Sequence, residues 1–233
     1  MKGVRLDYPI LAQGSDAWLE LRKRQAATCS QFGNAFGVGY KSRSKYMRVK
    51  LGLDDADEMN EVMKFGIDYE DWVCLMYCRF IESATGHRIQ LKTHGYRRFT
   101  DDPDSGGSPD RIVVDLDTGA SWPLEIKTRL HGGMRDFVPD SHKLQCVGIG
   151  VLFHSQFTDY CCWTPDEGIL LSRIRWEKEF WTDHLWPAIR EFNDLWRCGE
   201  IPARMPNGLA AERRALIDEM VYATPLSEEM QLQ

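Results

Sequence analysis

The segment that decides the fold reads SPDR at residues 108–111 and resumes ten residues later as WPLEIKT at residues 122–128. The second motif is typical of a strand. Side chains alternate between the two faces of a strand, so Glu125 and Lys127 are predicted to share one face and Ile126 to point to the other. Asp110 stands at the start of its own predicted strand. Two carboxylates and an ammonium group are therefore expected to converge.

These residue types suit metal-dependent hydrolysis of a phosphodiester. Asp110 and Glu125 offer the hard oxygen ligands that Mg²⁺ prefers, and the backbone carbonyl of Ile126 lies within reach of the same ion. Lys127 would position or deprotonate a metal-bound water, which a divalent ion makes nucleophilic near neutral pH. The motif pair alone also occurs by chance, and an ion pair on a solvated strand edge is the alternative interpretation.

Three further features favour the catalytic interpretation. Glu70 ends the motif GIDYE (66–70) on a strongly periodic predicted helix and would add a third carboxylate. Gln145 in HKLQC (142–146) is a polar residue on an otherwise apolar predicted helix, able to hydrogen-bond a phosphate or a backbone group. Arg22 in QGSDAWLELR (13–22), with the hydroxyls of TCS (28–30), would clasp a terminal phosphate.

Taken in this order, the motifs resemble the lambda-exonuclease-like family, also called the YqaJ or viral-type recombinase nucleases, within the PD-(D/E)xK superfamily. The resemblance covers residues 13–196 approximately. It implies an α/β chain with a restriction-endonuclease-like fold, in which a mixed central β-sheet is flanked by α-helices. We expect strands near 87–91, 111–116, 122–128, 157–163 and 169–176, and helices from residue 15, over 60–83, over 141–153 and over 177–198.

The resemblance also assigns roles to single residues. Asp110, Glu125 and the Ile126 carbonyl match the metal ligands, Lys127 the catalytic lysine, and Glu70 a helix-borne carboxylate that would reach the ion through water. Four positions match a pocket for a 5′-terminal phosphate, namely Arg22, Ser30, Ser108 and Gln145. In the basic 41–50 stretch, Arg43 is the leading candidate for guiding the DNA strand. Arg111 departs from the family pattern, because the lambda enzyme has glycine there.

The function implied is a Mg²⁺-dependent 5′-to-3′ exonuclease, with Mn²⁺ as a substitute, that digests one strand of linear duplex DNA from a 5′-phosphorylated end. It would leave 3′ single-stranded tails for recombination. An endonuclease or RNase of the same superfamily and a non-catalytic DNA-end-binding protein are the alternatives. Family members suggest a single-strand annealing partner and a ring-shaped homotrimer, with a monomer as the other option. The cysteine spacing does not reproduce the iron–sulfur arrangement of Cas4-like relatives, so no cluster is expected.

Length and composition limit the domain organisation and the mode of nucleic-acid binding. With 233 residues, the chain is expected to form one nuclease domain over residues 1–200 and a C-terminal extension over 201–233 that is part helical. The net charge of −6 excludes binding of nucleic acid by bulk electrostatics, although residues 1–50 carry ten basic against three acidic side chains. That segment is either a positive surface for a polyanion or a solvated basic face. No membrane span or secretion signal is expected, which favours the cytoplasm or a host cell interior.

Overall fold

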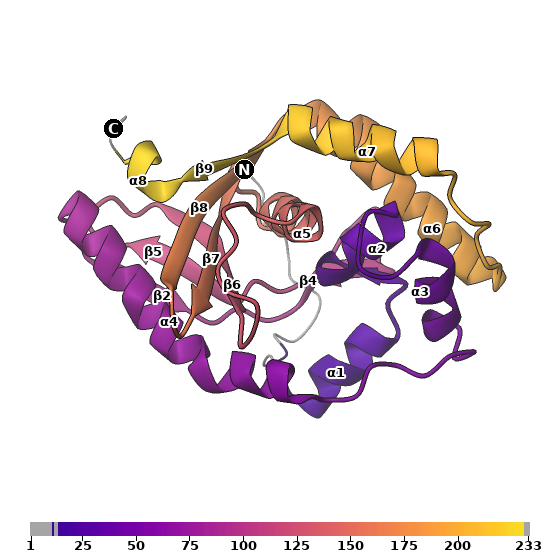
Figure 1. Cartoon of the computed structure of the whole chain (residues 1–233), viewed down its shortest axis with the longest axis horizontal. Coiled ribbons are helices and arrows are strands. Elements are labelled where there is room, and N and C mark those ends of the chain that lie inside the picture. Colours follow the sequence, from indigo (N-terminus) through magenta and orange to yellow (C-terminus); the bar gives the residue numbers. More distant parts are fainter. Residues whose placement is uncertain (1–10, 12–13, 231–233) are drawn as a thin grey trace.

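The computed structural model describes residue 11 and residues 14–230, and its centre is a mixed six-stranded β-sheet (Figure 1). The strand order is β2-β5-β6-β7-β8-β9. Only β6 and β7 run parallel, and the other neighbours are antiparallel. The strands are β2 (Ile89–Lys92), β5 (Arg111–Asp115), β6 (Ser121–Thr128), β7 (Phe157–Thr164), β8 (Gly168–Trp176) and β9 (Val221–Pro225). The α/β fold class and all five expected strands are confirmed.

Helices cover both faces of this sheet. Helix α4 (Glu61–Thr85) packs on one face, where its buried Tyr77 joins a cluster with Leu124 and Ile126 of β6. Helix α5 (Asp140–Leu152) lies against the other face (Figure 1). Because alternate β6 residues point to opposite faces, the apolar pair faces α4 while Glu125 faces α5, whose Gln145 it contacts. The expected alternation along β6 is confirmed.

A buried polar network ties α4 to the sheet. The Asp159 carboxylate on β7 is fully buried and accepts hydrogen bonds from the Tyr77 hydroxyl at 2.6 Å and the Trp122 indole at 2.7 Å. Arg173 on β8 forms an ion pair with the same carboxylate at 2.7 Å and lies over the ring of Phe157. A buried carboxylate needs such partners to stay charged, so the network fixes α4 in position.

A second, three-stranded sheet brings the N-terminal segment to the SPDR motif. Its order is β1-β4-β3, formed by β1 (Ala27–Thr28), β4 (Ser105–Gly107) and β3 (Arg97–Arg98). Because β1 pairs in parallel with β4, the residues after Thr28 lie beside the residues after Gly106. A Cβ atom at Gly106 would lie 2.2 Å from the carbonyl oxygen of Arg97, so only glycine allows this close strand pairing.

Three helices surround the second sheet. They are α1 (Asp16–Lys23), α2 (Phe32–Phe36) and α3 (Arg43–Lys50), with a short 3₁₀ turn, η1 (Cys29–Gln31), between β1 and α2. The Ser15 hydroxyl caps α1 by accepting a hydrogen bond from the Trp18 amide. Phe32 and Phe36 of α2 are buried in the larger hydrophobic core together with Tyr46 of α3.

The C-terminal region continues the main sheet. After the π-helical segment η2 (Phe180–Leu185) and α6 (Trp186–Cys198), the chain forms α7 (Asn207–Met220), β9 and α8 (Leu226–Glu229). Strand β9 pairs with β8 at the edge of the sheet (Figure 1). Among the described residues after position 200, the chain thus forms two helices and also supplies a strand that the sequence analysis did not predict. Residues 231–233 of the expected extension lie outside the described residues.

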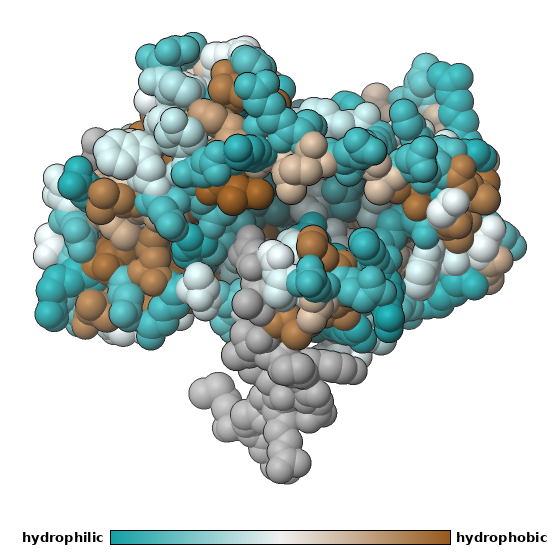
Figure 2. Space-filling view, turned by 90° about the horizontal axis from the view of Figure 1, so that it is seen from below, coloured by the Kyte–Doolittle hydropathy of each residue, from teal (hydrophilic) through white to brown (hydrophobic). Residues whose placement is uncertain are grey.

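The surface is hydrophilic with local apolar patches. Figure 2 shows such patches on the left of the face seen there, over α4, where Ile67 and Leu75 are 64% and 42% exposed. In the described part of the chain, none of the helices combines the length and the apolar character that a membrane span requires.

Candidate active site

Asp110, Glu125 and Lys127 meet where β5 and β6 pair. Asp110 directly precedes β5, and its Oδ2 accepts a hydrogen bond from the backbone N–H of Ile126 at 2.7 Å. On β6, the Lys127 Nζ donates to the Glu125 Oε1 at 2.5 Å. Antiparallel pairing of Arg111 with Leu124 holds the two strands in this register. The structure therefore brings together the three residues that the sequence predicts at the centre of the site.

The Glu125 carboxyl group is buried in a way that favours a bound cation. Glu125 is 1% exposed. Burial, as the larger cause, and repulsion from Asp110 together raise the pKa of its carboxyl group to about 8. Burial by itself would lower the pKa of Lys127, but attraction to Glu125 and Asp110 outweighs burial and raises it. The Glu125 Oε2 atom is buried and has no hydrogen-bond donor among the described residues. A buried carboxylate oxygen without a donor is costly unless a cation contacts it.

The donor set fits a hard divalent ion. The Asp110 and Glu125 carboxylates and the Ile126 carbonyl are oxygen ligands of the kind that Mg²⁺ and Mn²⁺ take. Within residue 11 and residues 14–230, no group of three or more His, Cys, Asp or Glu side chains has the geometry of a metal site. Two carboxylates with one carbonyl are compatible with Mg²⁺, because this ion keeps several of its own waters.

Glu70 reaches the cluster but is held by an arginine. From α4, its Oε1 pairs with the Nη1 of Arg111, which also donates to the Asp110 carbonyl oxygen at 2.7 Å. The Arg111 Nη2 donates to Asp71 at 2.8 Å. Burial first, and the charge of Asp110 second, raise the pKa of Glu70. Arg111 thus places a fixed positive charge between the helix-borne carboxylates and Asp110.

Three of the four residues predicted to hold a phosphate, Arg22, Ser30 and Ser108, are linked through direct contacts or through Trp18. The Arg22 Nη2 donates to the Ser30 Oγ at 3.0 Å, and its guanidinium lies 4.2 Å from the centre of the Trp18 ring. The Trp18 indole in turn approaches the Ser108 Oγ at 3.4 Å. The positive charge of Arg22 acts to lower the pKa of Glu125. Arg22 therefore contacts one hydroxyl directly, and Trp18 links it to a second one.

Gln145 has a more specific contact than the sequence analysis predicted. Its Nε2 donates to the Glu125 Oε1 at 2.6 Å, so the amide orients the Glu125 carboxyl group. The residue is 7% exposed on α5. In this structure the Gln145 amide nitrogen therefore contacts Glu125 directly.

Arg43 does not join the site. It begins α3, is 9% exposed, and forms an ion pair with Glu191 of α6 at 3.1 Å. Its guanidinium also lies 5.9 Å from the ring centre of Phe192. The structure therefore places Arg43 between α3 and α6, away from Asp110, Glu125 and Lys127.

Two residues of the candidate site, Trp18 and Arg111, were given no role in the sequence analysis. Trp18 links Arg22 to Ser108. The sequence pattern that could have indicated this role is the four-residue spacing of Trp18 and Arg22, which puts both side chains on one side of α1. Arg111 was noted only as a departure in the motif. Its contact with Glu70 joins residues 41 positions apart and depends on how α4 packs, which no local pattern reveals.

A mixed sheet with helices on both faces, presenting two carboxylates and a lysine at one strand junction, defines the chain as a nuclease-type protein of the restriction-endonuclease-like fold. More particularly, the chain belongs to the family of YqaJ-like viral recombinase domains, which it matches over residues 17–148. That match spans every residue of the cluster from Arg22 to Gln145. No curated protein matches the sequence.

Solved structures support the fold. The alkaline exonuclease LHK-Exo from Laribacter hongkongensis is 19% identical, with a TM-score of 0.56 over 88% of this chain and 97% of that one. Its complex with dAMP has a TM-score of 0.57 at 18% identity and the same coverage. A phage-related exonuclease from Haemophilus somnus 129PT has a TM-score of 0.51 at 12% identity, covering 73% of this chain and 92% of that one. Family and fold together support a nuclease of the lambda-exonuclease type.

Proposed function

We infer that this protein is a Mg²⁺-dependent 5′-to-3′ exonuclease that digests one strand of linear duplex DNA from a 5′-phosphorylated end and leaves 3′ single-stranded tails. The observation that carries the proposal is the buried Glu125 carboxyl, whose Oε2 has no donor in the described chain while its Oε1 contacts Lys127 and Gln145. A buried carboxylate oxygen without a donor is stabilised when it binds a cation, and it costs folding free energy when it does not.

Asp110, Glu125 and the Ile126 carbonyl would hold the Mg²⁺ or Mn²⁺, with Glu70 contributing through water. When bound, such an ion makes a water molecule nucleophilic and neutralises charge on a phosphoryl oxygen. Gln145 keeps the Glu125 carboxylate in one orientation through its 2.6 Å hydrogen bond. The Ile126 amide does the same for Asp110. Both ligands are therefore positioned before any ion arrives, which lowers the cost of binding it.

Lys127 acts as a positioned cation. Because Glu125 and Asp110 raise its pKa, the ammonium group stays protonated at neutral pH. It therefore donates a hydrogen bond to the attacking water or to a phosphoryl oxygen and stabilises developing negative charge.

Arg22, with Ser30 and Ser108, would bind the 5′-terminal phosphate. The stacking of Arg22 on Trp18 and its hydrogen bond to Ser30 fix the guanidinium next to the metal carboxylates. A planar guanidinium and hydroxyl groups match the oxygens of a phosphate. Anchoring the terminal phosphate at a set distance from the ion selects the next phosphodiester for cleavage without reading sequence.

Four DNA substrates test the proposal in the presence of Mg²⁺: linear duplex with a 5′-phosphate, the same duplex with a 5′-hydroxyl, a closed circle, and single strand. We expect rapid digestion of the first, slower digestion of the second and an intact circle. Arg22→Ala should remove the advantage of the 5′-phosphate. Cutting of the circle would instead show an endonuclease, and binding of ends without digestion would show a non-catalytic end-binding protein.

Family membership also supports proposals about assembly. We expect a homotrimeric ring that acts in the cytoplasm, or inside a host cell, with a single-strand annealing protein that loads onto the 3′ tail. A mass measurement in solution distinguishes the trimer from the monomeric alternative. Capture of the tail by the partner would be seen as faster annealing of resected DNA when both proteins are present.

A further inference from the structure

Arg111 lies beside the proposed metal ligands, and the proposed chemistry gives it no role. It follows Asp110 directly and begins β5, where backbone pairing with Leu124 of β6 fixes its position. Its side chain is 14% exposed. Because a guanidinium group does not lose its proton in proteins, this position carries a permanent and partly buried positive charge.

Oxygen atoms of three residues hold the guanidinium. Its Nη1 pairs with the Glu70 Oε1 and donates to the Asp110 backbone oxygen at 2.7 Å, while its Nη2 donates to the Asp71 Oδ1 at 2.8 Å. The Glu70 side chain is 27% exposed and that of Asp71 is 95% exposed. Water screens the contact with Asp71, so the contact with Glu70 is the stronger of the two.

The candidate site has more carboxylates than one divalent ion requires. Nucleases that use two such ions hold them about 3.5–4 Å apart. Asp110 and Glu125 form one pair of ligands, and Glu70 is the carboxylate that could extend this pair to a second ion. Across residue 11 and residues 14–230, however, no three His, Cys, Asp or Glu side chains are placed to hold a metal together. Glu70 instead contacts Arg111.

A divalent ion and the Arg111 guanidinium exclude each other at Glu70. Mg²⁺ lies about 2.0–2.1 Å from its oxygen ligands, which is shorter than an N–H···O hydrogen bond. An ion bound to the Glu70 Oε1 and the Asp110 backbone oxygen would therefore overlap with Nη1, which contacts both atoms. The two positive charges would also repel each other strongly in a partly buried site. The arginine thus removes both the space and the ligand that a second ion needs.

We propose that Arg111 takes the place of a second divalent ion, an inference that rests on the proposed nuclease function. The site then binds one ion, through Asp110, Glu125 and the Ile126 carbonyl. The guanidinium supplies the remaining positive charge next to these ligands. A fixed arginine stabilises charge on a phosphoryl group as a metal ion does, and it needs no ion from solution to do so.

Titration with Mn²⁺, followed by electron paramagnetic resonance, tests this proposal by counting the bound ions. The titration is done with dAMP present, because its phosphate can complete the shell of an ion and it has no phosphodiester to digest. The wild-type protein should bind one Mn²⁺ per chain and give the spectrum of an isolated ion. Arg111→Ala removes the charge and opens the space, so it should bind two and give the coupled spectrum of ions about 3.5–4 Å apart.

Two control variants connect the second ion to this position. Arg111→Ala combined with Glu70→Gln should bind a single Mn²⁺ again, because the second ion has lost its carboxylate. Arg88→Ala removes an arginine that is 73% exposed and pairs with Asp117 outside the cluster, and it should bind one Mn²⁺ like the wild-type protein. Thermal melts verify that each variant is folded.

The wild-type count tests the inference even if Arg111→Ala does not fold. Two coupled Mn²⁺ ions in the wild-type protein would overturn the inference, and so would a single ion in a folded Arg111→Ala protein. In both cases, Mg²⁺-dependent digestion of linear duplex would still uphold the nuclease function. A wild-type protein that bound no Mn²⁺ and digested no DNA would overturn both.

Discussion

At the scale of single residues, the proposed chemistry depends most directly on the Lys127 ammonium. It donates to the buried Glu125 carboxyl at 2.5 Å, and attraction to Glu125 and Asp110 raises its pKa. Lys127→Ala should lower the rate of digestion of linear duplex by about 10²–10⁴-fold, the usual contribution of a positioned proton donor. Gel-based digestion under single-turnover conditions measures this.

Lys178→Ala serves as the control, because Lys178 is an exposed lysine outside the cluster. It should digest DNA at the wild-type rate. Circular dichroism would verify that both variants are folded. A Lys127→Ala protein with wild-type activity would remove this lysine from the mechanism.

Arg111 would oppose the binding of a divalent ion at the candidate site. Its guanidinium contacts Glu70, Asp71 and the Asp110 carbonyl, and a fixed positive charge at this range opposes a second cation. Arg111→Met keeps most of the side-chain volume and removes the charge. We expect it to bind Mn²⁺ about three- to tenfold more tightly, as measured by calorimetry without DNA.

Arg88→Met is the matched control, since Arg88 pairs with Asp117 on the β5–β6 hairpin, outside the cluster. Its Mn²⁺ affinity should equal that of the wild-type protein. Weaker binding in Arg111→Met would show that this arginine supports the ligands more than it repels the ion.

The central residues of the site could be predicted from sequence, while their surroundings could not. Glu125 and Lys127 follow from the two-residue period of a strand, which is a local property. Asp110 follows from its place at the start of the neighbouring strand. Arg43 lies away from the cluster because it packs against α6, which begins more than a hundred residues later.

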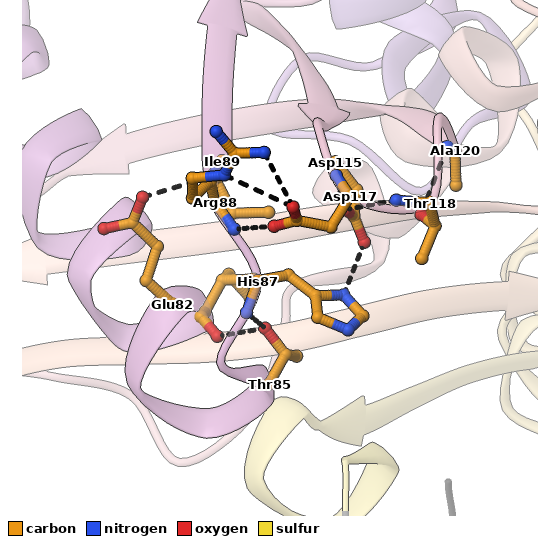
Figure 3. A network of polar contacts seen from close by, with 10 residues as sticks. Glu82, Thr85, His87, Arg88, Ile89, Asp115, Asp117, Thr118 and Ala120 are labelled. Carbon is orange, nitrogen blue, oxygen red and sulfur yellow. Dashed lines mark hydrogen bonds and ion pairs between the residues drawn. The ribbon is translucent and has the colours of Figure 1, made fainter.

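At the scale of elements, Asp115 joins the end of α4 to the β5–β6 hairpin (Figure 3). Its Oδ1 accepts hydrogen bonds from the backbone of Asp117 at 2.9 Å and Thr118 at 3.0 Å, and its Oδ2 lies 2.8 Å from the His87 ring. Burial by itself would raise the pKa of Asp115, but the hydrogen bonds from Thr118, His87 and Asp117 outweigh burial and lower it. The charged carboxylate is therefore the form that the folded protein prefers.

This preference determines the direction in which the stability of the folded protein changes with pH. The native pKa lies below the unfolded value of about 3.9, so the unfolded chain binds more protons in acid. The stabilisation is complete well above pH 4 and is lost as the pH falls towards the native pKa. Asp115→Asn should lower the melting temperature by about 2–4 °C near pH 7 and by less near pH 3. Thermal melts at both pH values measure the difference.

His87→Gln separates the carboxylate from its imidazole neighbour. If the pH dependence belongs to Asp115, the difference between the wild-type protein and Asp115→Asn should persist when both carry His87→Gln. If the difference in melting temperature between the wild-type protein and Asp115→Asn stayed constant from pH 7 to pH 3, the charge of Asp115 would contribute nothing to the stability of the hairpin.

Helices with explicit end signals were predictable, and elements without them were not. Helix α1 has its Ser15 cap, and α4 ends at Gly86, which takes the left-handed conformation expected there. In contrast, β9 covers five residues directly after a helix and has no flanking turn signal. It becomes a strand because the edge of β8 is available for pairing, which is a tertiary property. The π-helical η2 within the expected 177–198 helix likewise has no sequence signature.

At the scale of the whole molecule, four basic side chains between residues 14 and 50 are paired with carboxylates. Arg24, Lys41, Arg43 and Arg48 each form one such ion pair. Lys50 donates to two backbone carbonyl groups, and burial lowers its pKa to about 8. The basic side chains of the candidate active site, Arg22, Arg111 and Lys127, come from α1, β5 and β6.

The completeness of the sheet makes the C-terminal region necessary for stability. Strand β9 pairs with β8 from Val221 to Pro225, so without it β8 would expose an unpaired edge. Leu226 is fully buried in the cluster beneath α4, and the Arg175–Glu229 ion pair at 3.0 Å closes the same region. We expect a chain that ends at residue 220 to aggregate during purification, although it keeps every residue of the candidate active site.

A single substitution tests this dependence without removing the strand. Leu226→Ala deletes a fully buried side chain from the core and should lower the free energy of unfolding by about 3 kcal/mol. Leu209→Ala, on α7, deletes the same atoms from a 38% exposed side chain and should change it by less than about 0.5 kcal/mol. Urea denaturation of both variants gives the two values. Equal, small losses would mean that the residues after α7 attach loosely to the sheet, whereas the predicted sixfold difference would show that the nuclease fold includes them as its last strand.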